Sequence, residues 1–114
     1  MLLETLFMLM VGGQQNNNDN TNLKHMKVLK FGAVWCSGCL VMKPRWKEIE
    51  EENSWLQTEY YDFDNEKEMV NKYQIDNTLP TFVFLDKEDK EILRLNGEVS
   101  KEELIKIINK NKDR

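Results

Sequence analysis

The sequence predicts an α/β fold with a central mixed four-stranded sheet flanked by helices. Short apolar runs alternate along the chain with segments of helical periodicity, in the order β-α-β-α-β-β-α. The only two cysteines lie where the first strand meets the first helix, spaced as C-x-x-C. At 114 residues the chain is long enough for one domain with a modest core.

The first strand is expected over Val28–Val34, an apolar run, and the first helix over Leu40–Glu52. Pro44 lies inside this helix, where it should bend the axis and remove one backbone hydrogen bond. The helix alternates charged residues with apolar ones at helical spacing, and the apolar set is Leu40, Val41, Met42, Trp46 and Ile49.

A second strand is expected over Leu56–Phe63, which is rich in aromatic residues. A short helix over Glu66–Tyr73 should follow, capped by Asp64 or Asn65. Because a helix joins the first two strands, we expect them to be parallel with a right-handed crossover.

The third and fourth strands are expected over Thr81–Leu85 and Glu91–Asn96. The polar turn between them is short, so they should form an antiparallel hairpin. Ser100 and Glu103 have the spacing of a capping box that opens the last helix. The apolar face of that helix consists of Leu104, Ile105, Ile107 and Ile108.

We expect a folded domain over residues 27–110, preceded by a segment outside the core (1–26) and followed by a tail (111–114). Residues 1–11 are nearly all apolar but are shorter than the about 20 residues that span a bilayer. They also lack the basic start and cleavage site of a signal peptide. Residues 14–22 are a polar linker. A cytoplasmic protein without a stable membrane span is expected, the alternative being a membrane-attached or exported protein if residues 1–11 are part of an anchor.

The net charge of −4 and the 32% of charged residues favour a soluble protein, without the basic field that nucleic-acid binding requires. Cys36 would lie near the start of the first helix, where unpaired N–H groups and the helix dipole favour a thiolate. Such placement lowers a thiol pKa from about 8.5 to between roughly 3.5 and 7.5. Cys39 lies on the same face one turn further in, within reach of a disulfide. We therefore expect Cys36 to be the exposed nucleophile and Cys39 to be more buried.

A purely structural disulfide is a weaker interpretation, because so small a loop constrains the unfolded chain little. Metal handling is a further alternative. Only His25 could add a ligand to the two cysteines, and there is no second C-x-x-C, so we expect no metal site.

Four features together resemble the thioredoxin family over about Lys27–Asn109. These are the element order, the motif Trp35-Cys36-Ser37-Gly38-Cys39, Pro44 five residues later, and Leu79-Pro80-Thr81 after the second helix. Gly97 extends the resemblance. The resemblance implies a thiol–disulfide oxidoreductase in which Cys36 attacks, Cys39 resolves and Pro80 is cis.

The predicted substrate-binding residues are Trp35, Leu79, Pro80 and Gly97. Trp35 would supply an apolar wall beside Cys36, the alternative being ordinary packing at the strand end. If Pro80 faces the cysteines, Leu79 would present its backbone N–H and C=O to an extended substrate segment. The alternative is a trans proline that starts a strand.

Three departures from the family are visible. Ser37-Gly38 stands where thioredoxins usually carry Gly-Pro, and Lys30 stands where most have a buried aspartate. Tyr73 and Pro80 are one residue further apart than usual, which we interpret as an insertion within residues 76–78.

Lys30 could reach the space below Cys39 and favour a thiolate, or lie along the sheet with its charge in water. We hypothesise that Lys30→Ala raises the Cys36 pKa. The Cys39 proton would pass to water or to a carboxylate nearby in the chain, for which the candidates are Glu59, Asp62 and Asp64.

The sequence thus predicts a monomeric protein of cell redox homeostasis that reduces or exchanges protein disulfides. No bound cofactor is implied, and a thioredoxin-reductase-like flavoenzyme or another dithiol protein must recharge it. Without a histidine between the cysteines, a reductase or moderate-potential exchanger is expected rather than a strong oxidant. The alternative is a redox-inactive binding module on the same fold, with Lys30 as the sign of lost turnover.

Overall fold

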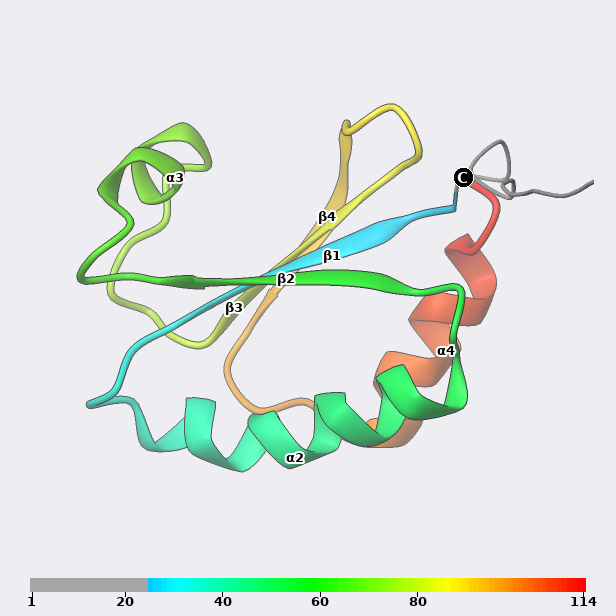
Figure 1. The fold of residues 1–114 in the computed structure, drawn as a ribbon, viewed down its shortest axis with the longest axis horizontal. Helices are drawn as coiled ribbons and strands as arrows, with labels where there is room; N and C mark the ends of the chain where they lie inside the picture. The colour runs from blue at the N-terminus through cyan, green and yellow to red at the C-terminus, as the bar shows by residue number, and fades with distance from the viewer. Residues whose placement is uncertain (1–24) are drawn as a thin grey trace, which may run out of the picture.

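The computed structural model describes residues 25–114, so the apolar segment 1–11 and the linker 14–22 lie outside the described residues. The predicted element order is confirmed (Figure 1). The elements are β1 (Lys27–Gly32), α2 (Ser37–Glu52), β2 (Gln57–Asp62), α3 (Lys67–Lys72), β3 (Thr81–Leu85), β4 (Glu91–Asn96) and α4 (Lys101–Asn111).

The four strands form one mixed sheet in the order β2-β1-β3-β4. Strand β1 pairs in parallel with β2 and antiparallel with β3, and β3 and β4 form the antiparallel hairpin. Both predicted pairings are therefore confirmed. In this register Lys30 of β1 lies opposite Tyr60 of β2, which places the two side chains on the same face of the sheet.

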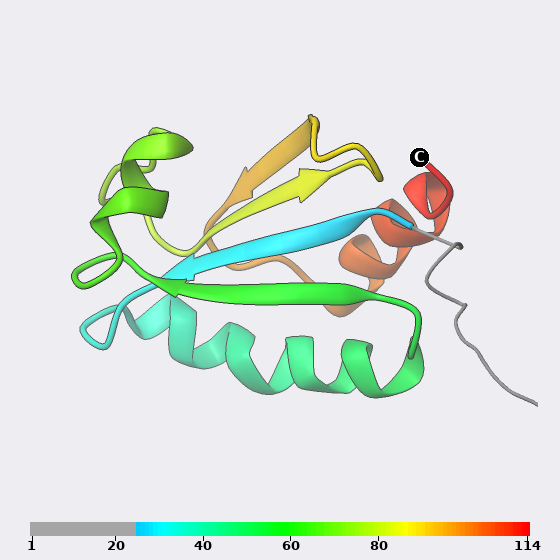
Figure 2. The same cartoon turned by 45° about the horizontal axis from the view of Figure 1, so that its top comes forward.

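The helices cover the two faces of the sheet unequally. Helices α2 and α4 lie on one face and α3 on the other (Figures 1 and 2). The core under α2 and α4 contains Met26, Val28, Met42, Trp46, Ile49, Leu56, Phe82, Phe84, Leu104 and Ile108. The core under α3 contains Leu29, Phe31, Val70, Ile75, Val83 and Leu85. Alternation along β1 and β3 assigns neighbouring residues to opposite cores.

The junction between β1 and α2, and the buried face of α2, differ from the prediction. Strand β1 ends at Gly32, two residues early, and the backbone N–H of Cys36 donates to the Ala33 carbonyl (3.2 Å) in a turn that leads into the helix. Val34 is consequently exposed. Leu40 and Val41 are also exposed, because the buried face of α2 is set by Met42, Trp46 and Ile49 and successive helical residues are about 100° apart.

The predicted cap of α3 is wrong and that of α4 is confirmed. Glu66 is the N-cap of α3 and makes no side-chain capping bond. The predicted caps have other partners, because the Asn65 amide donates to Asp62 and the Asp64 carboxylate accepts from Trp35. At α4 the Ser100 hydroxyl accepts from the backbone N–H of Glu103 (3.1 Å).

Residues just outside the predicted domain bounds contact the fold at both ends. Met26 is fully buried in the core, and its N–H donates to the carbonyl of Lys112 (3.1 Å). Asn111 is buried, and the Arg114 carbonyl accepts from the N–H of Lys87 (3.2 Å). Residues 111–114 are thus tied to the fold, because the chain beyond α4 packs beside the start of β1.

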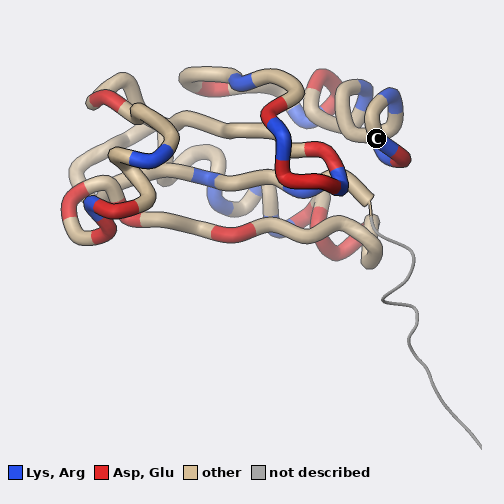
Figure 3. The backbone as a smooth tube through the Cα atoms, turned by 90° about the horizontal axis from the view of Figure 1, so that it is seen from above, with Lys and Arg blue, Asp and Glu red and all other residues tan. Residues whose placement is uncertain are grey.

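Charged residues of both signs are spread over the loops and helices of the described chain (Figure 3). None of the helices within residues 25–114 has the length and hydropathy of a membrane span.

Candidate active site

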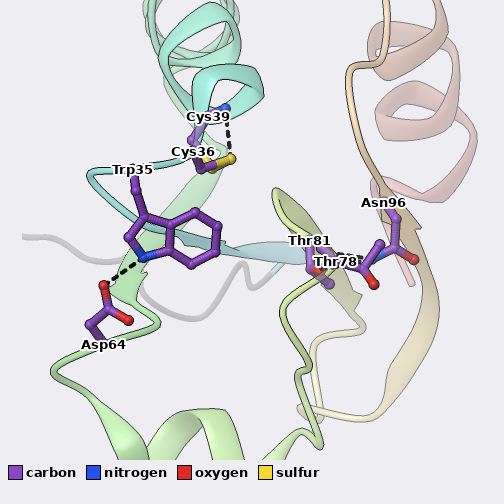
Figure 4. Close-up of a disulfide and its surroundings, with 7 residues drawn as sticks. All are labelled: Trp35, Cys36, Cys39, Asp64, Thr78, Thr81 and Asn96. Carbon is purple, nitrogen blue, oxygen red and sulfur yellow. Dashed lines mark hydrogen bonds between the residues drawn. A yellow bond between two sulfur atoms is a disulfide. The ribbon is translucent and has the colours of Figure 1, made fainter.

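The two cysteines form a disulfide at the start of α2, with their Cα atoms 5.3 Å apart (Figure 4). Cys36 is the N-cap residue, in extended conformation, as the strand-to-helix placement predicts. The backbone N–H of Cys39 donates to the Cys36 sulfur (3.2 Å). An otherwise unpartnered amide of the first helical turn therefore points at Cys36, which favours negative charge on that sulfur.

The predicted difference in burial between the two cysteines is wrong for the disulfide form. Cys36 is 6% exposed, whereas Cys39 is only half-buried. The reason is a cavity of about 380 Å³ that Cys39 lines and Cys36 does not. Its other walls include Lys30, Gly32, Trp46, Tyr60 and Pro80.

Trp35 flanks the disulfide with a fixed but accessible ring. Its indole N–H donates to the Asp64 carboxylate (2.8 Å; Figure 4). Its ring packs edge-on against that of Phe63, with 6.4 Å between the ring centres. The side chain stays 55% exposed, so it is not ordinary buried packing at a strand end.

Pro80 lies against the C-x-x-C segment, and the Leu79–Pro80 peptide bond is cis. The Pro80 Cδ is 3.1 Å from the position that a Cβ on Gly38 would take. A glycine at position 38 therefore allows the proline ring to approach the helix start closely. Gly97 supports this loop from β4, because its N–H donates to the Pro80 carbonyl (2.8 Å) while its φ of 85° suits glycine.

The polar groups of the loop before Pro80 form hydrogen bonds with one another. The Leu79 N–H donates to the Asn77 carbonyl (3.0 Å), so the prediction that this N–H is presented to a substrate is wrong. The Thr78 N–H donates to the Asp76 carboxylate (2.9 Å), and this hydrogen bond holds the Asp76 pKa below its usual value.

Two side chains anchor this loop to the sheet. The hydroxyl of Thr81 and the amide of Asn96 both donate to the Thr78 carbonyl, at 2.7 and 3.1 Å (Figure 4). The Asn96 amide also donates to the Thr81 hydroxyl (2.7 Å). The cis proline is thus held in place by strands β3 and β4.

Lys30 lies beside the Cys39 cavity, as one sequence-based interpretation expected, but it has a charged partner that neither interpretation included. Its ammonium lies 2.6 Å from the Glu50 carboxylate and 5.7 Å from the ring centre of Trp46, and its side chain is only 17% exposed. Glu50 also accepts from the Thr58 hydroxyl (2.7 Å). Lys30 does line the Cys39 cavity, but its charge is paired with a carboxylate rather than held in water.

Glu50 and Tyr60 are residues that the sequence analysis missed. Glu50 follows Trp46 by one helical turn, which was the available signal that it faces the sheet. Tyr60 lines the cavity, and partial burial and the carboxylates of Asp62 and Glu66 raise its pKa.

The predicted proton acceptors have other partners. Asp64 binds Trp35, Glu59 accepts from the Tyr61 hydroxyl, and Asp62 accepts within the turn before α3. Within the described residues, no carboxylate is among those that line the Cys39 cavity.

Comparison with known proteins places this arrangement among thioredoxins. The Thioredoxin family model matches residues 9–110. Thioredoxin H5 of Oryza sativa subsp. japonica is 36% identical over 88 residues, covering 73% of this chain and 64% of that protein. Thioredoxin H7 of Arabidopsis thaliana is 36% identical over 85 residues, covering 75% and 64%. The chain thus spans slightly less than two thirds of the length of these relatives.

Solved structures agree with this similarity. The thioredoxin NaTrxh of Nicotiana alata superposes with a TM-score of 0.71 at 27% identity, covering 80% of this chain and 76% of that one. Fasciola hepatica thioredoxin superposes with a TM-score of 0.71 at 30% identity, covering 82% and 86%.

Proposed function

This chain belongs to the thioredoxin family, and from that premise we propose that it is a thiol–disulfide oxidoreductase that reduces or exchanges protein disulfides. The observation that carries the proposal is the Cys36–Cys39 disulfide at the start of α2, with a helix amide directed at the Cys36 sulfur. Pro80 supports the proposal, because its ring lies against Gly38 between the two cysteines.

The proposed reaction has two exchange steps. In the first, the Cys36 thiolate attacks one sulfur of the substrate disulfide, so that a mixed disulfide forms and the other substrate sulfur leaves as a thiolate. In the second, the Cys39 thiol gives its proton to solvent and attacks the Cys36 sulfur. The second substrate sulfur then leaves reduced, and Cys36 and Cys39 become the disulfide seen here. Two electrons pass to the substrate.

Trp35 and the Pro80 loop are the proposed docking elements for the substrate. Trp35 offers an exposed apolar ring beside Cys36. Leu79 and Pro80 would contact the substrate from the other side, and Gly97 would act by holding the Pro80 carbonyl. The working form is proposed to be a monomer.

Turnover requires an external two-electron donor that reopens the disulfide. We propose a thioredoxin-reductase-like flavoenzyme or another dithiol protein, and a cytoplasmic location, which fractionation of cells that produce the full-length chain would test. A redox titration against glutathione would test the proposed moderate potential, each 30 mV corresponding to about 1.4 kcal/mol for this couple.

The decisive experiment is insulin reduction by dithiothreitol at catalytic protein concentration. The wild-type protein should accelerate precipitation of the insulin B chain, and Cys36→Ser should abolish the acceleration. In a separate incubation without dithiothreitol, pre-reduced Cys39→Ser should trap a mixed disulfide with insulin that mass spectrometry detects, because Cys36 can still attack but nothing resolves the product. Ser37→Ala is the control and should keep the activity, since it changes an exposed residue between the two cysteines and leaves both sulfurs in place. An inactive wild-type protein would favour the redox-inactive binding module instead.

A further inference from the structure

The cavity beside Cys39 is built around the missing side chain of Gly32. A Cβ at that position would lie 3.0 Å from the Tyr60 hydroxyl oxygen and 3.1 Å from the Cys39 sulfur. The oxygen and the sulfur therefore flank the same point and are no further apart than the sum of these distances. A side chain at position 32 would be in close contact with both atoms.

Strand register brings the Tyr60 side chain to this point. Tyr60 lies opposite Lys30 in the parallel pair β1–β2, and both side chains line the cavity on the α2 face. Tyr61, the next residue, stacks on Phe31 on the opposite face of the sheet. Of the two neighbouring tyrosines, only Tyr60 is thus placed to meet Cys39.

We propose that the Tyr60 hydroxyl is the hydrogen-bond donor that stabilises the Cys39 thiolate when the Cys36–Cys39 disulfide is opened. This inference rests on the proposed oxidoreductase function and assigns a residue to its recharging step. A hydroxyl that donates to a thiolate favours the charged form of that sulfur, as hydrogen bonds to ionised groups generally do.

The step balances without a proton transfer to the protein. The thiolate of an external dithiol attacks the Cys36 sulfur and forms a mixed disulfide. The Cys36–Cys39 bond breaks, and its electron pair leaves on Cys39, which becomes the thiolate. Tyr60 keeps its proton throughout and turns its O–H toward this sulfur. Stabilising the leaving thiolate accelerates the opening.

The charges around Cys39 are consistent with this role. Lys30 of β1 and Lys43 of α2 line the same cavity, and Glu50 pairs with Lys30 behind it. Glu98 approaches from the other side, where its carboxylate lies 3.8 Å from the Cβ position of Gly38. The Tyr60 pKa is raised, so the hydroxyl remains protonated at neutral pH and can donate.

The test measures the ionisation of Cys39 alone. In a Cys36→Ser background, the rate of alkylation by iodoacetamide against pH reports only Cys39, because it is the one remaining cysteine. Tyr60→Phe should raise the pH of half-ionisation by about one unit, a tenfold weaker acid. Tyr61→Phe is the matched control, since it removes the same hydroxyl from the opposite face, and it should leave the titration unchanged. An equal midpoint for Tyr60→Phe and its parent would overturn the proposal.

A second measurement follows the opening of the disulfide itself. In the intact pair of cysteines, Tyr60→Phe should slow disulfide opening by dithiothreitol about three- to tenfold. Alkylation of reduced Cys36 by iodoacetamide should keep its rate.

Gly32→Ala is an independent variant. Its methyl group would crowd both the Tyr60 hydroxyl and the Cys39 sulfur, and by moving the hydroxyl away it should shift the Cys39 midpoint in the same direction. If insulin reduction fails in the wild type while the Cys39 midpoint still depends on Tyr60, the proposed function is wrong and the Tyr60 contact is right.

Discussion

The Lys30 ammonium lies 2.6 Å from the Glu50 carboxylate and joins strand β1 to helix α2 beside the cavity that Cys39 lines. Both side chains are largely withdrawn from water, at 17% and 32% exposure. The Thr58 hydroxyl donates to the same Glu50 oxygen, so the two partners belong to one small polar network. This pair occupies the region where the sequence comparison leads one to expect a buried aspartate.

We expect Lys30→Met and Glu50→Gln each to lower the free energy of unfolding by about 1–3 kcal/mol, because each leaves a partly buried polar group without its partner. The double variant should lose less than the sum, with a coupling of about 1 kcal/mol. Urea unfolding of the four proteins measures this. Lys101→Met, which breaks exposed pairs with Glu48 and Glu52, is the control and should change the free energy of unfolding much less than Lys30→Met does. Equal losses for the two lysine variants would contradict a special role for the Lys30 pair.

Lys30→Ala is also expected to raise the Cys36 pKa, since it would leave the Glu50 carboxylate near the site without its counterion. Thiolate absorbance titration of the reduced protein checks this. An unchanged titration would reject the idea.

Trp35 should contribute to substrate docking more than to stability. Trp35→Ala is expected to change the free energy of unfolding by less than about 1 kcal/mol, because the ring is 55% exposed. It should lower kcat/KM for insulin about fivefold or more while changing the rate with a small disulfide little. Asp64→Asn keeps the ring and weakens only its hydrogen bond, so a smaller loss is expected. If both substrates lose activity equally, the ring does not act in docking.

Tyr61 should titrate later than an ordinary tyrosine. Its hydrogen bond to Glu59, followed by burial, raises the Tyr61 pKa to about 12. Because the folded pKa lies above the unfolded value of about 10, the folded state holds this proton more tightly. The resulting stabilisation is complete below pH of about 10 and is lost as the pH rises toward about 12.

Absorbance at 295 nm against pH, compared between the wild type, Tyr61→Phe and Glu59→Gln, measures this late titration. Tyr61→Phe should remove the late component, and Glu59→Gln should move it to lower pH. A single tyrosine transition near pH 10 in the folded wild type would contradict the prediction.

The cap of α4 gives a prediction about stability alone. Ser100→Ala removes the side-chain acceptor of the Glu103 N–H and should lower the free energy of unfolding by about 1 kcal/mol. Ser100→Asp should retain most of it, because a carboxylate accepts from the same N–H and suits the helix start. Urea unfolding distinguishes the two, and an unchanged Ser100→Ala would mean that water replaces the cap.

Elements defined by a strong local pattern were predicted closely. Strands β3 and β4 have the predicted bounds, since a continuous apolar run and an alternating segment stand on either side of a polar turn. Ser100 was identified because capping depends on residues three positions apart. The predicted end of β1 was two residues late, because the turn at Ala33 carries apolar residues that continue the strand pattern.

The sequence by itself thus determined the element order, the strand pairings and the location of the cysteine pair at a helix start. Each of these follows from periodicity or from spacing within a few residues. Only the tertiary structure decided that Lys30 pairs with Glu50, that Tyr60 and Cys39 both lie beside Gly32 and that Cys36 is the more buried cysteine. These contacts depend on strand register and on the rotation of α2 over the sheet, which bring together residues twenty or more positions apart and leave no mark in the local pattern.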